Sequence, residues 1–104
     1  MALSAYLRRE GYDVIGFSAT GEEALQRARD GHPDMVFMDI RLAGEMDGIE
    51  TAEAISREGR VSFVFMTGHS TLAAVERVGA VAPAGYLTKP IDFSDIGGIL
   101  SRLA

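Results

Sequence analysis

Two nearly continuous apolar runs, at residues 35–38 and 61–66, constrain the fold of this chain more than any other feature. A strand with one face in water alternates apolar and polar residues, whereas a strand covered on both faces reads as an almost unbroken apolar run. Strands of the second kind occur in parallel sheets whose crossover connections contain helices. The two runs therefore predict an α/β fold with a parallel sheet and helices on both of its faces.

Segments with the spacing of amphipathic helices alternate with the predicted strands. Leu3, Tyr6 and Leu7 lie on one helical face, and Gly11 is expected to end this helix. Residues 12–17 then read as a short strand. The chain is therefore expected to open with a helix that is followed by a strand.

The same alternation continues along the chain. Thr20 and Glu23 form a capping box that predicts a second helix, which Gly31 ends before the first apolar run. A third helix is expected between Asp47 and Gly59, just before the second apolar run. Each predicted strand is thus separated from the next by a helix, as in right-handed βαβ units.

The last third of the sequence repeats the pattern once more. Leu72, Val75 and Val78 have the spacing of a short helix, and residues 85–88 read as a last short strand. Ser94 is expected to cap a final helix. The whole pattern predicts a doubly wound α/β domain with all strands parallel.

Length and composition exclude several classes of protein. At 104 residues the chain is expected to form a single domain, residues 1–104, and its net charge of −5 disfavours direct binding to nucleic acid or to anionic membranes. It contains no cysteine, so disulfides and thiolate metal sites are excluded. Its apolar runs are too short to span a bilayer, and it opens with charges instead of a signal peptide. A cytoplasmic location is expected.

Polar side chains stand where three of the predicted strands end. Asp39 follows the first apolar run, Thr67 follows the second, and Lys89 follows the last strand. Because ligands of open α/β sheets bind outside the carboxyl ends of the strands, we expect an acid, a hydroxyl and a cation to gather at one functional edge.

These residues lie in four short motifs, FMDIRL, MDGIE, FMTGH and GYLTKP, which occur in this order from the first apolar run onward. Together with the helix–strand pattern from Leu3 onward, the set resembles the receiver domain of bacterial two-component response regulators. The resemblance implies a flavodoxin-like sheet with the strand order 2-1-3-4-5. It also implies a signalling domain and not an enzyme.

The resemblance implies a role for each residue at the edge. Asp39 is similar to the phosphoacceptor of the family, Lys89 to the lysine that pairs with it, and Thr67 to the hydroxyl that contacts the phosphoryl group. The backbone amide of Gly68 resembles a further phosphate donor, and Tyr86 resembles the aromatic residue that moves with the threonine. The family's Lys-Pro pair, with its cis peptide, corresponds to residues 89–90.

The expected cofactor is Mg²⁺, with Asp39 and the backbone carbonyl of Arg41 as ligands. Family members also begin with a strand that ends in two adjacent acids, and this sequence opens directly in the first helix. The metal site is therefore expected to be incomplete. Glu45 and Asp47 bring two other carboxylates near the expected position of the metal, and the sequence leaves their role open.

The absence of this first strand also affects the fold. In the family's strand order it would lie in the centre of the sheet, so the sequence is expected to be that of an N-terminally truncated receiver. An empty central position exposes backbone groups and apolar surface. We expect a homo-oligomer, most simply a two-fold dimer with altered packing around Leu3, Tyr6, Leu7 and the segment after Gly11.

Three functions remain open at this point. The first is a phosphoryl-accepting receiver, with a sensor histidine kinase or phosphotransfer protein as donor and an output protein or domain as target. The second is a pseudo-receiver that keeps the fold as an interaction module with impaired Mg²⁺-dependent phosphorylation. The third is a small hydrolase that uses Asp39 as nucleophile, although the sequence provides no evident second acid or base.

Overall fold

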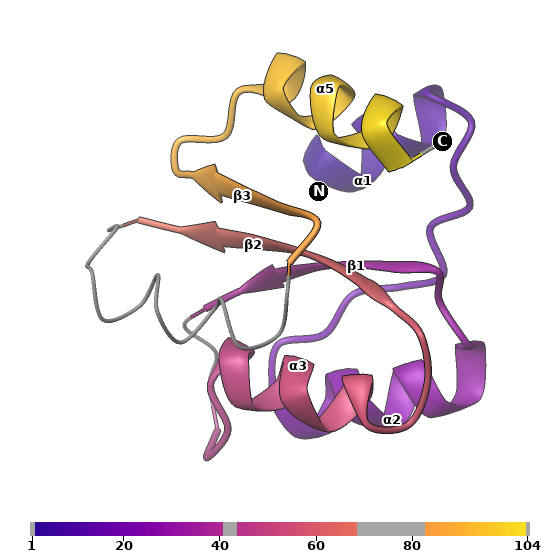
Figure 1. The fold of residues 1–104 in the computed structure, drawn as a ribbon, viewed down its shortest axis with the longest axis vertical. Coiled ribbons are helices and arrows are strands. Elements are labelled where there is room, and N and C mark those ends of the chain that lie inside the picture. Colours follow the sequence, from indigo (N-terminus) through magenta and orange to yellow (C-terminus); the bar gives the residue numbers. More distant parts are fainter. Residues whose placement is uncertain (1, 41–43, 69–82, 104) are drawn as a thin grey trace.

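The structure, a computed structural model, describes residues 2–40, 44–68 and 83–103. Its centre is a three-stranded parallel sheet with the order β1-β2-β3 (Figure 1). The strands are β1 (Met35–Asp39), β2 (Ser62–Thr67) and β3 (Gly85–Thr88). All three lie where the apolar runs and the last β-rich segment predicted them, which confirms the parallel α/β fold.

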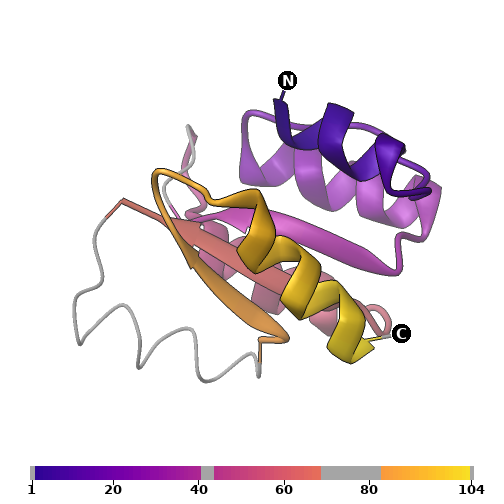
Figure 2. The ribbon, with the colours of Figure 1, turned by 90° about the horizontal axis from the view of Figure 1, so that it is seen from above.

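Helices cover both faces of this sheet. The helices α1 (Ala2–Arg9) and α5 (Phe93–Leu103) lie on one face, and α2 (Gly21–Gly31) and α3 (Gly48–Ser56) lie on the other (Figures 1 and 2). β2 is the middle strand and has the most buried side chains, including Phe63, Val64 and Phe65. The double coverage is the reason that its sequence is apolar at nearly every position.

Each face of the sheet has its own apolar cluster. On the α2–α3 face, Phe63 and Phe65 pack with Ile49, Ala52 and other buried side chains. On the α1–α5 face the buried members are Leu7, Val64, Leu87, Ile96, Ile99 and Leu100. The alternation of β2 side chains between the two clusters follows from the two-residue period of a strand.

Side chains close in sequence cap the first turns of α2 and α3. Thr20 Oγ1 accepts a hydrogen bond from the backbone N–H of Glu23 at 3.2 Å, and Asp47 forms a reciprocal capping box with Glu50. α2 ends at Gly31 as predicted, but the left-handed residue after it is His32, with φ of 47°. Both helices therefore begin at the predicted side chains.

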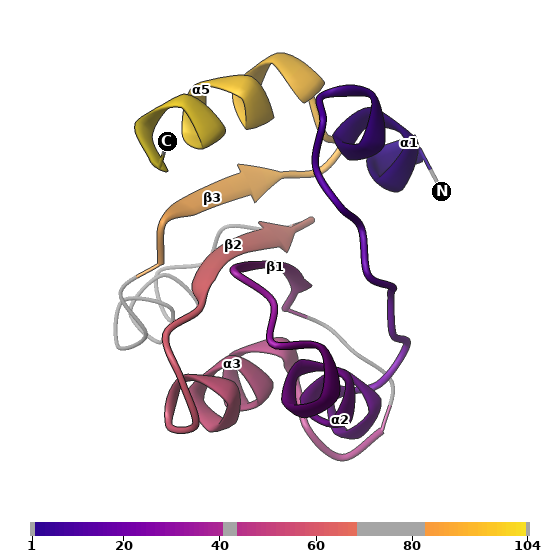
Figure 3. The same cartoon turned by 90° about the vertical axis from the view of Figure 1, so that its right-hand side faces the viewer.

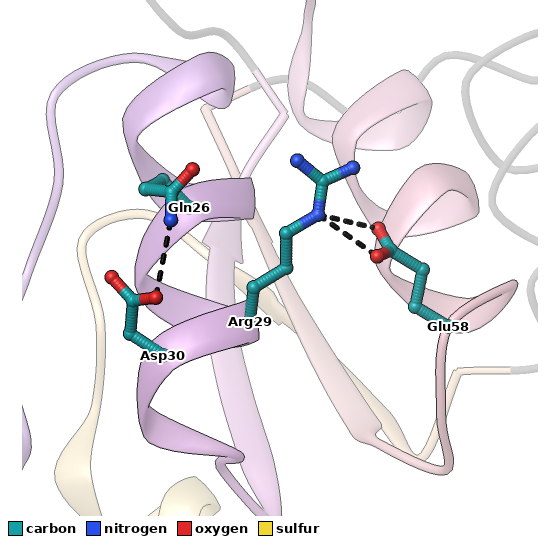
Figure 4. Close-up of polar contacts among 4 residues, drawn as sticks. All are labelled: Gln26, Arg29, Asp30 and Glu58. Atoms are coloured by element: carbon teal, nitrogen blue, oxygen red, sulfur yellow. Dashed lines mark hydrogen bonds and ion pairs between the residues drawn. The ribbon is translucent and has the colours of Figure 1, made fainter.

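A polar contact also joins α2 to the turn that follows α3. Arg29 Nε donates to both carboxylate oxygens of Glu58, at 2.8 and 3.1 Å, while Gln26 donates to Asp30 within α2 (Figure 4). The side-chain hydrogen bond that Arg29 donates to Glu58, followed by the negative charge of Glu58, raises the pKa of Arg29. Because both partners are about half exposed, this ion pair is expected to add little to the free energy of unfolding. Its main expected effect is to align the two helices.

The prediction of a strand at residues 12–17 is wrong. This connection between α1 and α2 forms no strand, and it passes the β1 side of the sheet (Figure 3). Its large side chains Tyr12, Ile15 and Phe17 are exposed to 44%, 51% and 69%. A strand needs a hydrogen-bonding neighbour, and the free edge of β1 has no strand partner among the described residues.

Two further predictions concern helices. The prediction that Ser94 caps the last helix is wrong, because α5 begins at Phe93 and the Asp92 carboxylate accepts from both the backbone N–H and the hydroxyl of Ser94. Aspartate competes well for this position because its charge also favours the helix N-terminus. The short helix predicted around Leu72, Val75 and Val78 lies outside the described residues.

Candidate functional site

The carboxyl ends of the three strands place the predicted polar residues at one edge of the sheet. Asp39 is the last residue of β1, Thr67 is the last residue of β2, and Lys89 directly follows β3. The backbone N–H of Lys89 donates to the carbonyl of Thr67 at 2.7 Å, which extends the β2–β3 ladder by one bond. Parallel pairing therefore aligns the strand ends, as the sequence predicted.

Asp39 and Lys89 meet across the end of β2. The Lys89 ammonium donates a hydrogen bond to Asp39 Oδ2, and the two side chains form an ion pair although they are 50 residues apart in sequence. The side chain of Asp39 is 30% exposed and that of Lys89 is 45% exposed. The carboxylate of Asp39 is thus partly buried. One of its oxygens contacts the Lys89 ammonium, and water can still reach the site.

The backbone beneath Asp39 is held by an unusually close approach of α3. The N–H of Gly48 donates to the carbonyl of Ile40 at 2.8 Å, and the N–H of Ile40 donates to Met66 at 3.1 Å. A Cβ atom on Gly48 would lie 1.9 Å from the carbonyl oxygen of Asp39. Gly48 therefore supports the site by letting α3 contact it, a role that the sequence analysis missed although the MDG motif contains this glycine.

Thr67 and Tyr86 belong to the two other strands, Thr67 to β2 and Tyr86 to β3. Thr67 is buried, with 7% of its surface exposed, while Gly68 after it is exposed. Tyr86 packs against the cluster on the α2–α3 face, and its buried hydroxyl has no hydrogen-bond partner among the described residues. The peptide bond between Lys89 and Pro90 is cis, which confirms the expectation for this motif.

The described residues do not fit a complete Mg²⁺ site. Mg²⁺ prefers several oxygen ligands in octahedral geometry, and no group of three or more potential metal-binding side chains occurs in residues 2–40, 44–68 and 83–103. Asp47 accepts the capping hydrogen bond of α3, and Glu45 is exposed. The predicted carbonyl ligand at Arg41 lies outside the described residues.

In the same described ranges, no helix has the length and apolar character needed to cross a bilayer. This agrees with the short apolar runs noted in the sequence. The helices instead carry one apolar stripe each, which they bury against the sheet.

Comparison with known protein sequences identifies relatives of this chain. The transcriptional regulatory protein PdtaR of Mycobacterium tuberculosis is 35% identical over 96 residues, which are 92% of this chain and 46% of the relative. The transcriptional regulatory protein ZraR of Escherichia coli is 33% identical over 101 residues, 96% of this chain and 22% of the relative. The chain thus spans less than half the length of these relatives.

Solved structures with a similar fold are receiver domains. The signal receiver domain of a modulated diguanylate cyclase from Desulfovibrio desulfuricans has a TM-score of 0.89 at 34% identity, covering 97% of this chain and 80% of that one. The receiver domain of a sensor histidine kinase from Pseudomonas aeruginosa has a TM-score of 0.82 at 28% identity, with 97% and 84% covered. That second structure has a magnesium ion coordinated in its active site cleft.

The sequence profile of the response regulator receiver domain matches residues 1–101. The match includes the three strand ends, the helices α1, α2 and α3, and α5 as far as residue 101. The parallel sheet with helices on both faces is therefore that of a known signalling domain. This chain belongs to the response regulator receiver domains of two-component signalling.

Proposed function

We propose that this domain accepts a phosphoryl group on Asp39 from the phosphohistidine of a sensor histidine kinase or phosphotransfer protein. The observation that carries the proposal is the ion pair between Asp39 and Lys89 at the aligned strand ends. In the proposed signalling role, the modification changes a surface that an output protein or domain recognises, and the exchange takes place in the cytoplasm.

The proposed reaction is a transfer between two nucleophiles. A carboxylate oxygen of Asp39 attacks the phosphorus atom, the P–N bond to the histidine breaks, and its electron pair returns to the imidazole, which takes a proton from water. The product is an acyl phosphate on Asp39. Because phosphoryl transfer depends mainly on alignment and charge neutralisation, the ammonium of Lys89 is well placed to balance the phosphoryl oxygens.

Two groups at the end of β2 complete the proposed phosphate contacts. The hydroxyl of Thr67 is the side-chain donor, and the backbone N–H of Gly68 is the second donor. Thr67 is held rigidly by the β2–β3 ladder, since its carbonyl accepts from Lys89 at 2.7 Å. A donor on a rigid strand end loses little freedom when the phosphoryl group arrives.

Tyr86 is the proposed element that transmits the change. Its buried hydroxyl has no hydrogen-bond partner among the described residues, and leaving such a group unpaired costs about 1–3 kcal/mol. That unfavourable state supports a second ring position, which a shift of Thr67 toward the phosphoryl group would favour. Thr67 and Tyr86 are then expected to share one two-state equilibrium.

The proposal is tested by intact-mass measurement after incubation with a small-molecule phosphodonor, with and without Mg²⁺. We expect one added phosphoryl group, strongly reduced in Lys89→Ala and absent in Asp39→Asn. Asp34→Asn is the matched control, because Asp34 lies at the opposite end of β1 and is exposed. Phosphorylation of Asp39→Asn at the wild-type rate would rule out Asp39 as the acceptor.

A pseudo-receiver is the second candidate, and one observation favours it: the described carboxylates do not gather into a metal site. On that reading the chain binds partners through its surface without Mg²⁺-dependent phosphorylation. The same measurement separates the two functions. If no mass is added with Mg²⁺ while a partner kinase still binds, the pseudo-receiver is the better description.

A further inference from the structure

The start of α3 contacts both the end of β1 and the first turn of α2. The helices α2 and α3 lie side by side on one face of the sheet (Figures 1 and 3). Gly21, the first residue of α2, is buried. A Cβ atom at this position would lie 2.1 Å from Thr51 Oγ1 and 2.9 Å from Met46 Cβ. Both distances are shorter than real Cβ contacts, so the packing of the two helices admits no side chain at residue 21.

Neither neighbour of Gly21 can move aside freely. Thr51 is fully buried, and its hydroxyl donates a hydrogen bond to the backbone carbonyl of Asp47 at 2.8 Å. A β-branched side chain in a helix has few alternative rotamers, so turning the Thr51 hydroxyl away from Gly21 would break this bond. The Cβ atom of Met46 is fixed to the backbone directly before Asp47. A methyl group on Gly21 would therefore displace the backbone at the N-cap of α3.

The same part of α3 contacts the proposed phosphoacceptor. Gly48 directly follows the N-cap residue, and its N–H donates to the carbonyl of Ile40 at 2.8 Å. The position of a Cβ atom on Gly48, only 1.9 Å from the carbonyl oxygen of Asp39, shows that α3 packs directly on the peptide between Asp39 and Ile40. A displacement of the N-cap is therefore passed to the backbone that carries the Asp39 carboxylate.

We propose that Gly21 is a positioning residue for Asp39. Because residue 21 has no side chain, the start of α3 can pack closely on α2, and in this position it holds the backbone of Asp39 in place. Gly21 touches no reacting atom, so its effect passes through Met46, Thr51 and Gly48. The consequence for the reaction rests on the proposed phosphorylation of Asp39, whereas the effect on the backbone does not.

Two measurements on Gly21→Ala test the proposal at a temperature where the chain is folded. Phosphorylation by phosphoramidate with Mg²⁺ present, followed by intact mass, should be about tenfold slower than in wild type, because a displaced acceptor is misaligned with the phosphorus atom. In two-dimensional NMR spectra, the amide resonances of Ile40 and Gly48 should shift, because both N–H groups donate backbone hydrogen bonds beside Asp39.

Two controls separate positioning from a general change in stability. Gly31→Ala makes the same substitution at the other end of α2, where a Cβ atom meets only the side chain of Ile15, and it should leave the rate and both resonances unchanged. Leu25→Ala removes apolar contact with the cluster on the α2–α3 face. It should lower the melting temperature without slowing phosphorylation of the folded chain. Equal slowing in Leu25→Ala and Gly21→Ala would assign the effect to stability and overturn the proposal.

Thr51→Ala provides a rescue, because it removes the atom nearest to the new methyl group. Gly21→Ala combined with Thr51→Ala should be phosphorylated at least about threefold faster than additive effects of the two single variants allow, as expected for residues in contact. If Gly21→Ala alone does not fold, the double variant should fold. A double variant that is no better folded would show that the contact with Thr51 is not the cause, and this would also overturn the proposal.

The remaining outcomes are also decisive. Phosphorylation of Gly21→Ala at the wild-type rate, unchanged resonances of Ile40 and Gly48, or additive rates in the double variant would each contradict a positioning role. If wild type itself accepts no phosphoryl group, the proposed function fails. The two resonances then still decide whether Gly21 holds the backbone of Asp39 in place.

Discussion

The middle strand of the sheet and the connection between α1 and α2 have similar residue types, but the strand is buried and the connection is exposed. Both contain consecutive β-branched and aromatic residues, yet Phe63, Val64 and Phe65 are at most 2% exposed, while Phe17 is 69% exposed. The strand has partners on both edges and helices on both faces, whereas the connection has no strand neighbour among the described residues. A segment with high β-propensity thus forms a strand only where a neighbouring strand can pair with its backbone.

The largest expected effect compares one phenylalanine from each region. Phe65→Ala should lower the free energy of unfolding by about 3–5 kcal/mol, because it leaves a cavity between β2 and α3. Phe17→Ala should change it by less than about 0.5 kcal/mol, because that ring is in water. Urea unfolding at micromolar concentration measures both. A comparable loss for the two variants would show that the connection is packed in solution and would break the comparison.

A smaller effect is expected from a glycine that supports the site. Gly48→Ala places a methyl group against the carbonyl of Asp39 and should lower stability by about 1–3 kcal/mol. It should also slow phosphorylation of Asp39, since the backbone of the acceptor must shift. Gly59→Ala is the control, because nothing lies within 4 Å of a Cβ atom at that position. Equal stability of the two variants would mean that α3 can retreat from β1 without loss.

The smallest effect concerns pH at the start of α5. Hydrogen bonds from the Ser94 hydroxyl and backbone N–H lower the pKa of Asp92 below its ordinary value of 3.8. A lowered folded-state pKa stabilises the fold fully above the unfolded pKa, and this contribution is lost as the pH falls through the folded pKa. Below pH 4, wild type should therefore lose slightly more thermal stability than Asp92→Asn. Identical melting curves for the two over that range would remove Asp92 from the acid response.

Strong local signals explain what could be read without the structure. The apolar runs predicted β1 and β2, and the capping residues Thr20 and Asp47 predicted where α2 and α3 begin. The positions of Asp39, Thr67 and Lys89 at one edge also followed, because parallel strands have their carboxyl ends on the same side. These features depend on short-range chemistry or on the topology of a parallel sheet.

Other features depend on contacts that a sequence does not display. Residues 12–17 carry a strand signal, but the central neighbour that such a strand needs is not among the described strands. Gly48 is needed because α3 approaches the Asp39 carbonyl closely, and the Tyr86 hydroxyl is buried with no hydrogen-bond partner among the described residues. In each case the neighbour belongs to another element.

The sequence by itself therefore determined the class of fold, the strands β1 to β3 and the residues at the edge of the sheet, because periodicity and capping act within a few residues. Only the tertiary structure decided that Gly48 lets α3 approach the Asp39 carbonyl and that the α1–α2 connection lies exposed beside β1. Those outcomes depend on which surfaces compete for burial and hydrogen bonds, and that competition is settled only when all elements pack together.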